Sequence, residues 1–221
     1  MRLRERLGVT PRRQRQFVRL MQVVLLGFVF IGLDRGDLRI VVNAGVALAV
    51  TYLPAVIERN YRVPLDAGLT LWITLAVFLH AVGTTGLPGM SRGLYDTFAW
   101  WDSVTHALSA SVVAAAGYAT ARAVDAHWEG VHLPGRFTFV FVVLFVLAFG
   151  VVWEVIEFGL GGAAATFGFQ QVLVQHGIED TMTDLVFNAV GAVVVGTWGQ
   201  IHDRLDRVVD AVVARSRSGR A

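Results

Sequence analysis

Six long apolar stretches constrain this chain more than any other feature. A helix that crosses a membrane needs about 20 mostly apolar residues. A soluble helical protein would need polar stripes at helical spacing, and the first, second and fifth stretches lack them. The pattern therefore predicts an all-α polytopic membrane protein, a bundle of six transmembrane helices. The stretches lie at about 17–33, 38–57, 66–87, 102–121, 137–158 and 181–201.

Charged residues are few and gather outside these stretches. They make up 16% of the chain, against about 25% in soluble proteins. We expect one transmembrane domain over residues 17–201, a basic N-terminal segment over 1–16 and a basic C-terminal tail over 202–221. The chain has no cysteine, which excludes disulfides and thiolate chemistry.

The arginines predict how the helices are oriented. If the six helices alternate in direction, sixteen of the 19 arginines fall on one side, which includes both termini. Such residues concentrate on the cytoplasmic side, so both termini are predicted to be cytoplasmic, in a multi-pass protein of the plasma membrane. Because membrane topology accounts for the arginines, we expect membrane lipids and no nucleic acid as partners. The other three are Arg35, Arg39 and Arg92.

The acidic and histidine residues placed inside the apolar stretches all fall at the same end of the predicted bundle. Such groups are costly in lipid and persist mainly where they face the bundle interior and serve a function. Helices that alternate in direction bring these groups to one depth near the outer face. The residues are His80, Asp102, His106, Glu154, Glu157, Asp180 and Asp184, followed by Asn188.

Their spacing predicts a metal site. Asp102 and His106 are four residues apart, and Glu154 and Glu157 three apart, so each pair shares a helix face. Carboxylates and imidazoles that project inward from facing helices are how metal sites in helical bundles are built. The candidate ligands of a divalent metal ion, whose identity stays open, are Asp102, His106, Glu154, Glu157 and Asp184. The candidate catalytic residues are His80, Asp180 and Asn188.

Structural roles are the alternative for each of these residues. Thr181 and Asp184 match a helix-capping box, and Asp180 is more simply read as a cap. Asp102 can be an N-cap, and His106 a buried histidine hydrogen-bonded to a neighbouring helix. Glu154 and Glu157 can extend to the outer interface.

The connection between the fifth and sixth stretches, residues 159–180, is long, rich in glycine and free of arginine. Connections of this length are uncommon unless they have a function. It is either a lid or re-entrant segment over the polar cluster or a loop that lies on the membrane surface. The residues that a lid would contribute are Gln175, His176 and Glu179.

Several motifs resemble those of a known family. Trp101-Asp102-Ser103-Val104-Thr105-His106, Trp153-Glu154-x-x-Glu157 and Gln175-His176-Gly177-Ile178-Glu179-Asp180-Thr181-x-x-Asp184-x-x-x-Asn188-x-x-Gly191 together resemble the YjdF-type integral membrane proteins, a family of unassigned function. The order of the motifs is also similar to VanZ-like membrane proteins, which are associated with glycopeptide tolerance and the cell envelope. The basic residue usual before the last VanZ motif is replaced by Glu179 and Asp180. The resemblance implies a polytopic membrane protein with a polar site at its outer face.

Three functions fit this pattern. The first is a metal-dependent enzyme, or a binding protein, that acts on a lipid or cell-envelope substrate at the outer leaflet; one carboxylate or His80 would then be the general base. The second is a small transporter or proton-coupled carrier. The third is a structural membrane protein whose polar network only fixes helix packing.

Overall fold

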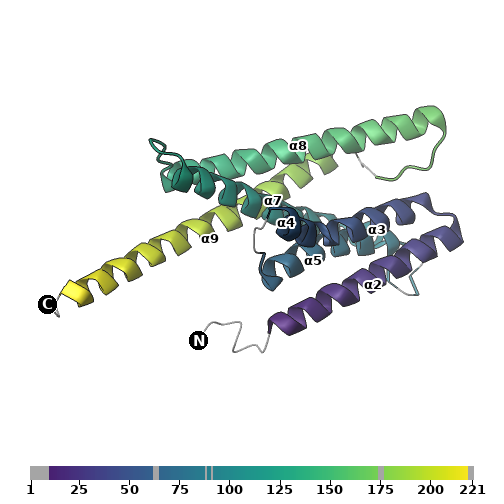
Figure 1. The fold of residues 1–221 in the computed structure, drawn as a ribbon. Helices are drawn as coiled ribbons and strands as arrows, with labels where there is room; N and C mark the ends of the chain where they lie inside the picture. Colours follow the sequence, from purple (N-terminus) through teal and green to yellow (C-terminus); the bar gives the residue numbers. More distant parts are fainter. Residues whose placement is uncertain (1–9, 62–64, 88, 91, 174–176, 219–221) are drawn as a thin grey trace.

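The computed structural model describes residues 10–61, 65–87, 89, 90, 92–173 and 177–218, and within these ranges it is helical, without a strand (Figure 1). Six helical segments are long and apolar enough to cross a membrane, so the predicted all-α bundle of six spans is confirmed. The helices are α2 (Pro11–Arg35), α3 (Leu38–Thr51), α4 (Leu53–Tyr61), α5 (Ala67–Thr85), α6 (Leu94–Thr97), α7 (Trp100–His127), α8 (Gly135–Phe167) and α9 (Ile178–Ser218).

Local signals decide where the first helices begin and end. Thr10 caps α2 by accepting a hydrogen bond from Arg13, and Pro11 occupies the first turn, where its missing N–H costs nothing. The helix therefore begins before the apolar stretch that starts at residue 17. It ends at Gly36, whose φ of 63° is in the left-handed region that favours glycine. Asp37 then caps α3.

The second predicted span is two helices rather than one. The chain leaves α3 at Thr51 and starts α4 at Leu53, with Tyr52 between them. Pro54 lacks the N–H that would continue the hydrogen-bond ladder through this point, and its ring opposes a continuous helix. Despite this break, α3 and α4 together form one candidate span, Leu38–Tyr61.

The helices pack as two groups of three. In the first group, α2, α3 and α5 bury Leu25, Ala44 and Ala81 completely. In the second group, α7, α8 and α9 pack around a core that includes Ala114 and Val142. Contacts between the described residues of the two groups run mainly from α5 to α7, with α6 beside them.

Small residues bring α7 and α9 close together. A Cβ added at Gly191 of α9 would collide with the backbone carbonyl oxygen of Ala107 in α7. Glycine and alanine permit such close approach between helices in a membrane, where van der Waals packing replaces the hydrophobic drive. Gly196 lies one turn further along, against the ring of Phe139 in α8.

The connection between the last two spans is shorter than predicted. Residues 159–167 continue α8, which ends where Gly168 adopts a φ of 71°. The glycines at 159, 161 and 162 do not stop the helix, because the alanines that follow favour helix strongly. Helix α9 begins at Ile178 rather than at residue 181, and it continues through Ser218 beyond the predicted end of the span.

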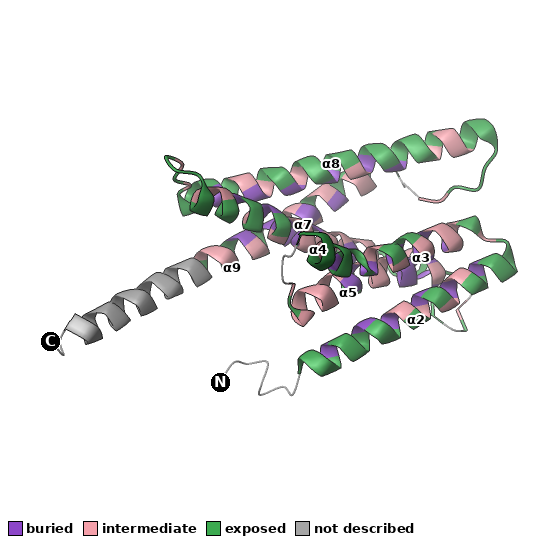
Figure 2. Ribbon diagram, in the orientation of Figure 1, coloured by how far each residue is buried: buried purple, intermediate pink, exposed green. Residues whose placement is uncertain are grey.

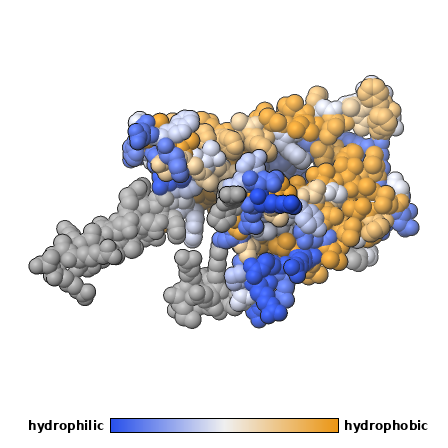
Figure 3. Space-filling view, viewed as in Figure 1, coloured by the Kyte–Doolittle hydropathy of each residue, from blue (hydrophilic) through white to orange (hydrophobic). Residues whose placement is uncertain are grey.

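The surface of the bundle is apolar where lipid would contact it. Large apolar side chains such as Val23, Val152 and Val194 are about 60% exposed or more. Figure 2 places the exposed residues on the outward sides of the helices, and Figure 3 shows a broad hydrophobic surface over α8 and over α2 and α3. Exposed apolar patches of this size mark an interaction surface, here the bilayer.

We expect Gly191→Ala to destabilise the fold by about 1–3 kcal/mol, because the new methyl group overpacks the crossing of α7 and α9. Gly27→Ala is the matched control, since a Cβ at Gly27 meets nothing within 4 Å. That change should be neutral or stabilising, because alanine is the better helix former. Denaturant unfolding in mixed micelles measures both, and equal stabilities would show that the crossing has room to spare.

Candidate metal and ligand site

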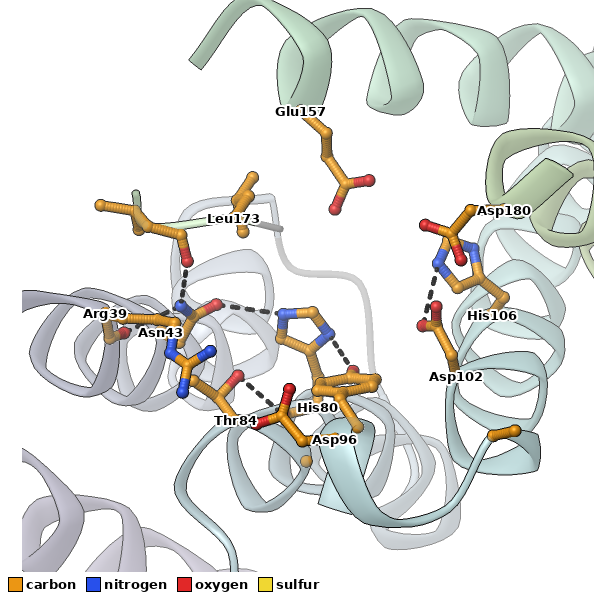
Figure 4. A pocket seen from close by; sticks show the side chains of 14 residues that line it. Arg39, Asn43, His80, Thr84, Asp96, Asp102, His106, Glu157, Leu173 and Asp180 are labelled. Carbon is orange, nitrogen blue, oxygen red and sulfur yellow. Dashed lines mark hydrogen bonds and ion pairs between the residues drawn. The ribbon is translucent and has the colours of Figure 1, made fainter. Parts of the chain in front are cut away.

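Five helix ends meet at one end of the bundle and enclose a polar cavity of about 290 Å³. The starts of α3, α7 and α9 and the later parts of α5 and α8 contribute its walls (Figures 1 and 4). Five of the residues predicted from the sequence line it: His80, Asp102, His106, Glu157 and Asp180. The cavity lies at the junction of the two groups of helices, a common place for binding sites.

His106 lies between two carboxylates. Its Nε2 atom is 3.5 Å from Asp102 Oδ1 on the same helix and 3.6 Å from Asp184 Oδ2 on α9. The side chain of Asp184 is 3% exposed, that of His106 13% and that of Asp102 30%. The group is therefore buried on the α9 side and accessible through Asp102.

The same three residues have the donor set of a metal site. One ligand atom from each lies within 4.8 Å of the other two. Ligand distances of about 2.0–2.2 Å around one ion place neighbouring donor atoms roughly 3–4 Å apart, so the 3.5 and 3.6 Å separations fit a shared ion. Two carboxylates and an imidazole suit Mg²⁺, Mn²⁺, Zn²⁺ or Fe²⁺.

Glu154 and Glu157 are buried rather than extended to the interface. They are 5% and 7% exposed, so the alternative in which they extend to the outer surface is wrong. Thr181 donates a hydrogen bond of 2.9 Å to Glu154 Oε2. The other oxygen, Glu154 Oε1, is buried without a hydrogen-bond partner among the described residues. Glu157 lines the cavity, and Figure 4 shows its carboxyl group reaching toward the cavity centre.

The capping alternatives for Asp184, with Thr181, and for Asp102 are also wrong. Because α9 begins at Ile178, Thr181 and Asp184 lie inside the helix and cannot form a box at its start. Asp180 is in the first turn and lines the cavity. Because α7 begins at Trp100 with Ala99 as its N-cap, Asp102 is in the first turn rather than at the cap.

The remaining predicted residues lie outside the group formed by Asp102, His106 and Asp184. Glu179 lines a second cavity of about 310 Å³, which shares Ala99, Asp102 and Asp180 with the first and is also lined by Asp184. Asn188 is buried at 5% exposure, and its side chain lies against Gly150 of α8. Gln175 and His176 are outside the described residues.

His80 is held by a chain of hydrogen bonds. Its Nε2 atom is 3.1 Å from Asn43 Oδ1 on α3, and its Nδ1 atom is 2.6 Å from the Tyr95 hydroxyl on α6. Asn43 donates through Nδ2 to the carbonyl oxygens of Arg39 and Val172, at 2.8 and 3.0 Å. The Asn43 oxygen must therefore accept from His80, which makes Nε2 the protonated nitrogen and Nδ1 the acceptor of the Tyr95 proton.

Tyr95 links this chain of hydrogen bonds to α7. Its hydroxyl is 3.2 Å from Thr105 Oγ1, and Thr105 donates to the backbone carbonyl of Asp102 at 2.8 Å. Burial raises the pKa of the Tyr95 phenol above its usual range, so the group keeps its proton and donates it to His80. A Cβ at Gly83 would collide with the Tyr95 ring, so the glycine leaves room for it.

The described part of the α8–α9 connection is tied to the start of α3. Gln170 accepts a hydrogen bond of 2.7 Å from the Leu38 N–H and donates to Asp37 at 3.2 Å. Together with the bond from Asn43 to Val172, this places Val172 and Leu173 in the cavity wall. The segment over residues 168–173 therefore covers one side of the site.

Sequence reasoning missed three residues of the site: Asn43, Tyr95 and Arg39. Asn43 is a single amide within an apolar run, a signal that was available and not used. Tyr95 lies on a short helix outside every predicted span. Arg39 counted only toward topology in the sequence, yet it lines the cavity.

These features define a multi-pass α-helical membrane protein with a carboxylate and histidine cluster at one end of its bundle. Residues 17–204 match the family described as "Predicted membrane protein (DUF2238)", and the chain belongs to this family. The expected membership of a membrane-protein family of unassigned function is confirmed.

One curated relative shares part of the sequence. An uncharacterized protein from Thermotoga maritima is 26% identical over 140 residues, which cover 63% of this chain and 66% of that protein. The match thus spans just under two thirds of the relative's length. No solved structure matches the chain.

We expect Tyr95→Phe to destabilise the protein by about 1–3 kcal/mol, because His80 Nδ1 loses its donor in a buried position. Tyr52→Phe is the matched control; Tyr52 is 53% exposed, and the change should stay within about 0.5 kcal/mol. Thermal unfolding in detergent compares the two variants. Equal stabilities would mean that His80 is held by Asn43 alone.

Proposed function

We propose that this protein binds a divalent cation through Asp102, His106 and Asp184 and uses it to act on a lipid or cell-envelope substrate. The observation that supports the proposal most directly is His106 Nε2 between two carboxylate oxygens at 3.5 and 3.6 Å, beside a cavity. Buried charges persist when they are paired or coordinate a metal, and the three groups come from two helices that cross closely.

Glu157 and Asp180 line the cavity next to these three ligands. A bound cation would polarise a phosphoryl or carbonyl oxygen, or activate a water molecule. A carboxylate that does not bind the cation is then the general base, and Glu157 is the leading candidate because it reaches into the cavity (Figure 4). His80 acts through Tyr95 rather than directly, because both of its ring nitrogens are engaged.

We expect the purified protein to bind Mn²⁺, and His106→Ala to weaken that binding by at least about 100-fold, because one of three ligands is lost. His127→Ala is the matched control: it is on the same helix, exposed at its far end, and bonds only the Ala123 carbonyl among the described residues. Titration followed by electron paramagnetic resonance measures both. A folded protein that binds no cation, or a variant that binds as well as the parent, would refute the metal site.

The proposal places the site at the outer face of the plasma membrane, with both termini in the cytoplasm. The absence of cysteine allows single-cysteine labelling without background. We expect a membrane-impermeant maleimide to label Phe169→Cys on intact cells and to leave Glu129→Cys unlabelled until the membrane is opened. Both positions are exposed in connections at opposite ends of α8. The reverse labelling pattern would put the site in the cytoplasm.

A purely structural role is the second candidate, because the His80 chain is satisfied within the protein. The two proposals differ at Asp184. If the network is structural, Asp184→Asn still offers His106 a hydrogen-bonding partner, and the stability of the fold changes little. At a metal site it removes a charged ligand, so cation binding is lost while the fold remains.

A further inference from the structure

The cavity has an arginine on one side and a group of carboxylates with His106 on the other, and the Asp96 carboxylate also lines it. Arg39 and Asn43, both from α3, lie on one side of His80, and Asp102, His106 and Asp180 lie on the other (Figure 4). Among the described lining residues, Arg39 is the only one with a permanent positive charge. A ligand that spans the cavity therefore meets a guanidinium at one end and the proposed cation site at the other.

The donors between these two ends are already used. Asn43 donates to two backbone carbonyls, Tyr95 donates to His80, and Thr84 donates to the His80 carbonyl at 3.4 Å. The Arg39 guanidinium makes no ion pair or hydrogen bond to the described residues. The Arg39 guanidinium is thus the hydrogen-bond donor on this side of the cavity that is still available to a ligand.

The position of Arg39 is fixed by its backbone. Its carbonyl accepts from Asn43, and the turn before it is held by Gln170 through Leu38 and Asp37. The guanidinium therefore projects from a backbone that both α3 and the 168–173 segment hold. A planar guanidinium matches the paired oxygens of a phosphate, and this one extends from an ordered backbone.

We propose that the cavity binds a phosphate group that bridges Arg39 and the cation at Asp102, His106 and Asp184. The inference deepens the function proposed above and rests on it, because without the cation the carboxylates Glu157 and Asp180 would repel a phosphate. With the cation bound, its charge offsets those of Asp102 and Asp184, and an open coordination position can accept one phosphate oxygen while Arg39 binds the other side of the same group.

The size and surroundings of the cavity fit the head group of a lipid. At about 290 Å³ it is at the lower limit of small-molecule pockets, roughly 300–1,000 Å³, so acyl chains must lie outside it. Ala99 lines the cavity between Phe98 and Trp100, which are 42% and 56% exposed. Exposed aromatic residues of this kind favour the membrane interface, where a lipid phosphate lies.

The test measures binding of inorganic phosphate, short-chain phosphatidic acid and short-chain phosphatidylethanolamine to the purified protein in neutral detergent, with and without Mn²⁺. We expect Mn²⁺ to strengthen phosphate binding, and Arg39→Gln to weaken it about tenfold or more. Arg35→Gln, an exposed arginine at the end of α2 outside the cavity lining, should change it less than about twofold. Mn²⁺ binding itself should be unchanged in Arg39→Gln, which shows that the variant is folded.

The outcomes separate the two proposals. Tighter binding of phosphatidic acid than of inorganic phosphate assigns the ligand to a lipid, and equal binding assigns it to a soluble phosphate compound; both support the bridge. If Mn²⁺ binds but the affinity for phosphate is the same in Arg39→Gln as in the parent protein, only this inference is overturned. If phosphatidylethanolamine binds without metal and competes with Mn²⁺, its amine occupies the acidic side and the bridge is wrong. If Mn²⁺ does not bind at all, the function proposed above fails first.

Discussion

The cost of burying charge near the end of a membrane bundle governs the rest of this structure. Asp184, Glu154 and Glu157 are each at most 7% exposed, in a region where an unpaired carboxylate is strongly unfavourable. The chain meets this cost by bringing His106 against Asp184, and Thr181 against Glu154. The close crossing of α7 and α9, with Gly191 against the Ala107 backbone, keeps the first pair together.

The two groups of helices make different contributions to the cavity. The group of α7, α8 and α9 supplies the carboxylates and His106, the groups with cation chemistry. The group of α2, α3 and α5 supplies Asn43 and His80, which are engaged with each other, and Arg39. Tyr95 on α6 connects the groups by its contacts with His80 and Thr105. The cavity therefore needs residues from both groups of helices.

The spans and the end of the bundle that holds the site could be predicted from the sequence, because both follow from where charge is tolerated in lipid. Hydropathy located every span, and alternation of direction placed His80, Asp102, His106 and Asp180 together. Helix ends were harder to predict, since Pro11, Pro54 and Gly168 act through local backbone geometry rather than through hydropathy. Asn43, Tyr95 and Arg39 were missed because a single polar residue in α3, or one in a connection, has no periodic pattern, and only tertiary packing brings them to the cavity.

The length of α8 has a consequence for how the membrane acts on this protein. Its 33 residues extend about 50 Å at 1.5 Å per residue, well beyond a hydrocarbon core of about 30 Å. A helix that is too long for its bilayer tilts, and the tilt changes with bilayer thickness. Because α8 carries Glu154 and Glu157 and packs against both α7 and α9, its tilt is instead set by these neighbours. The carboxylates thus keep their place beside α7 and α9 while the excess length of α8 extends past the hydrocarbon core.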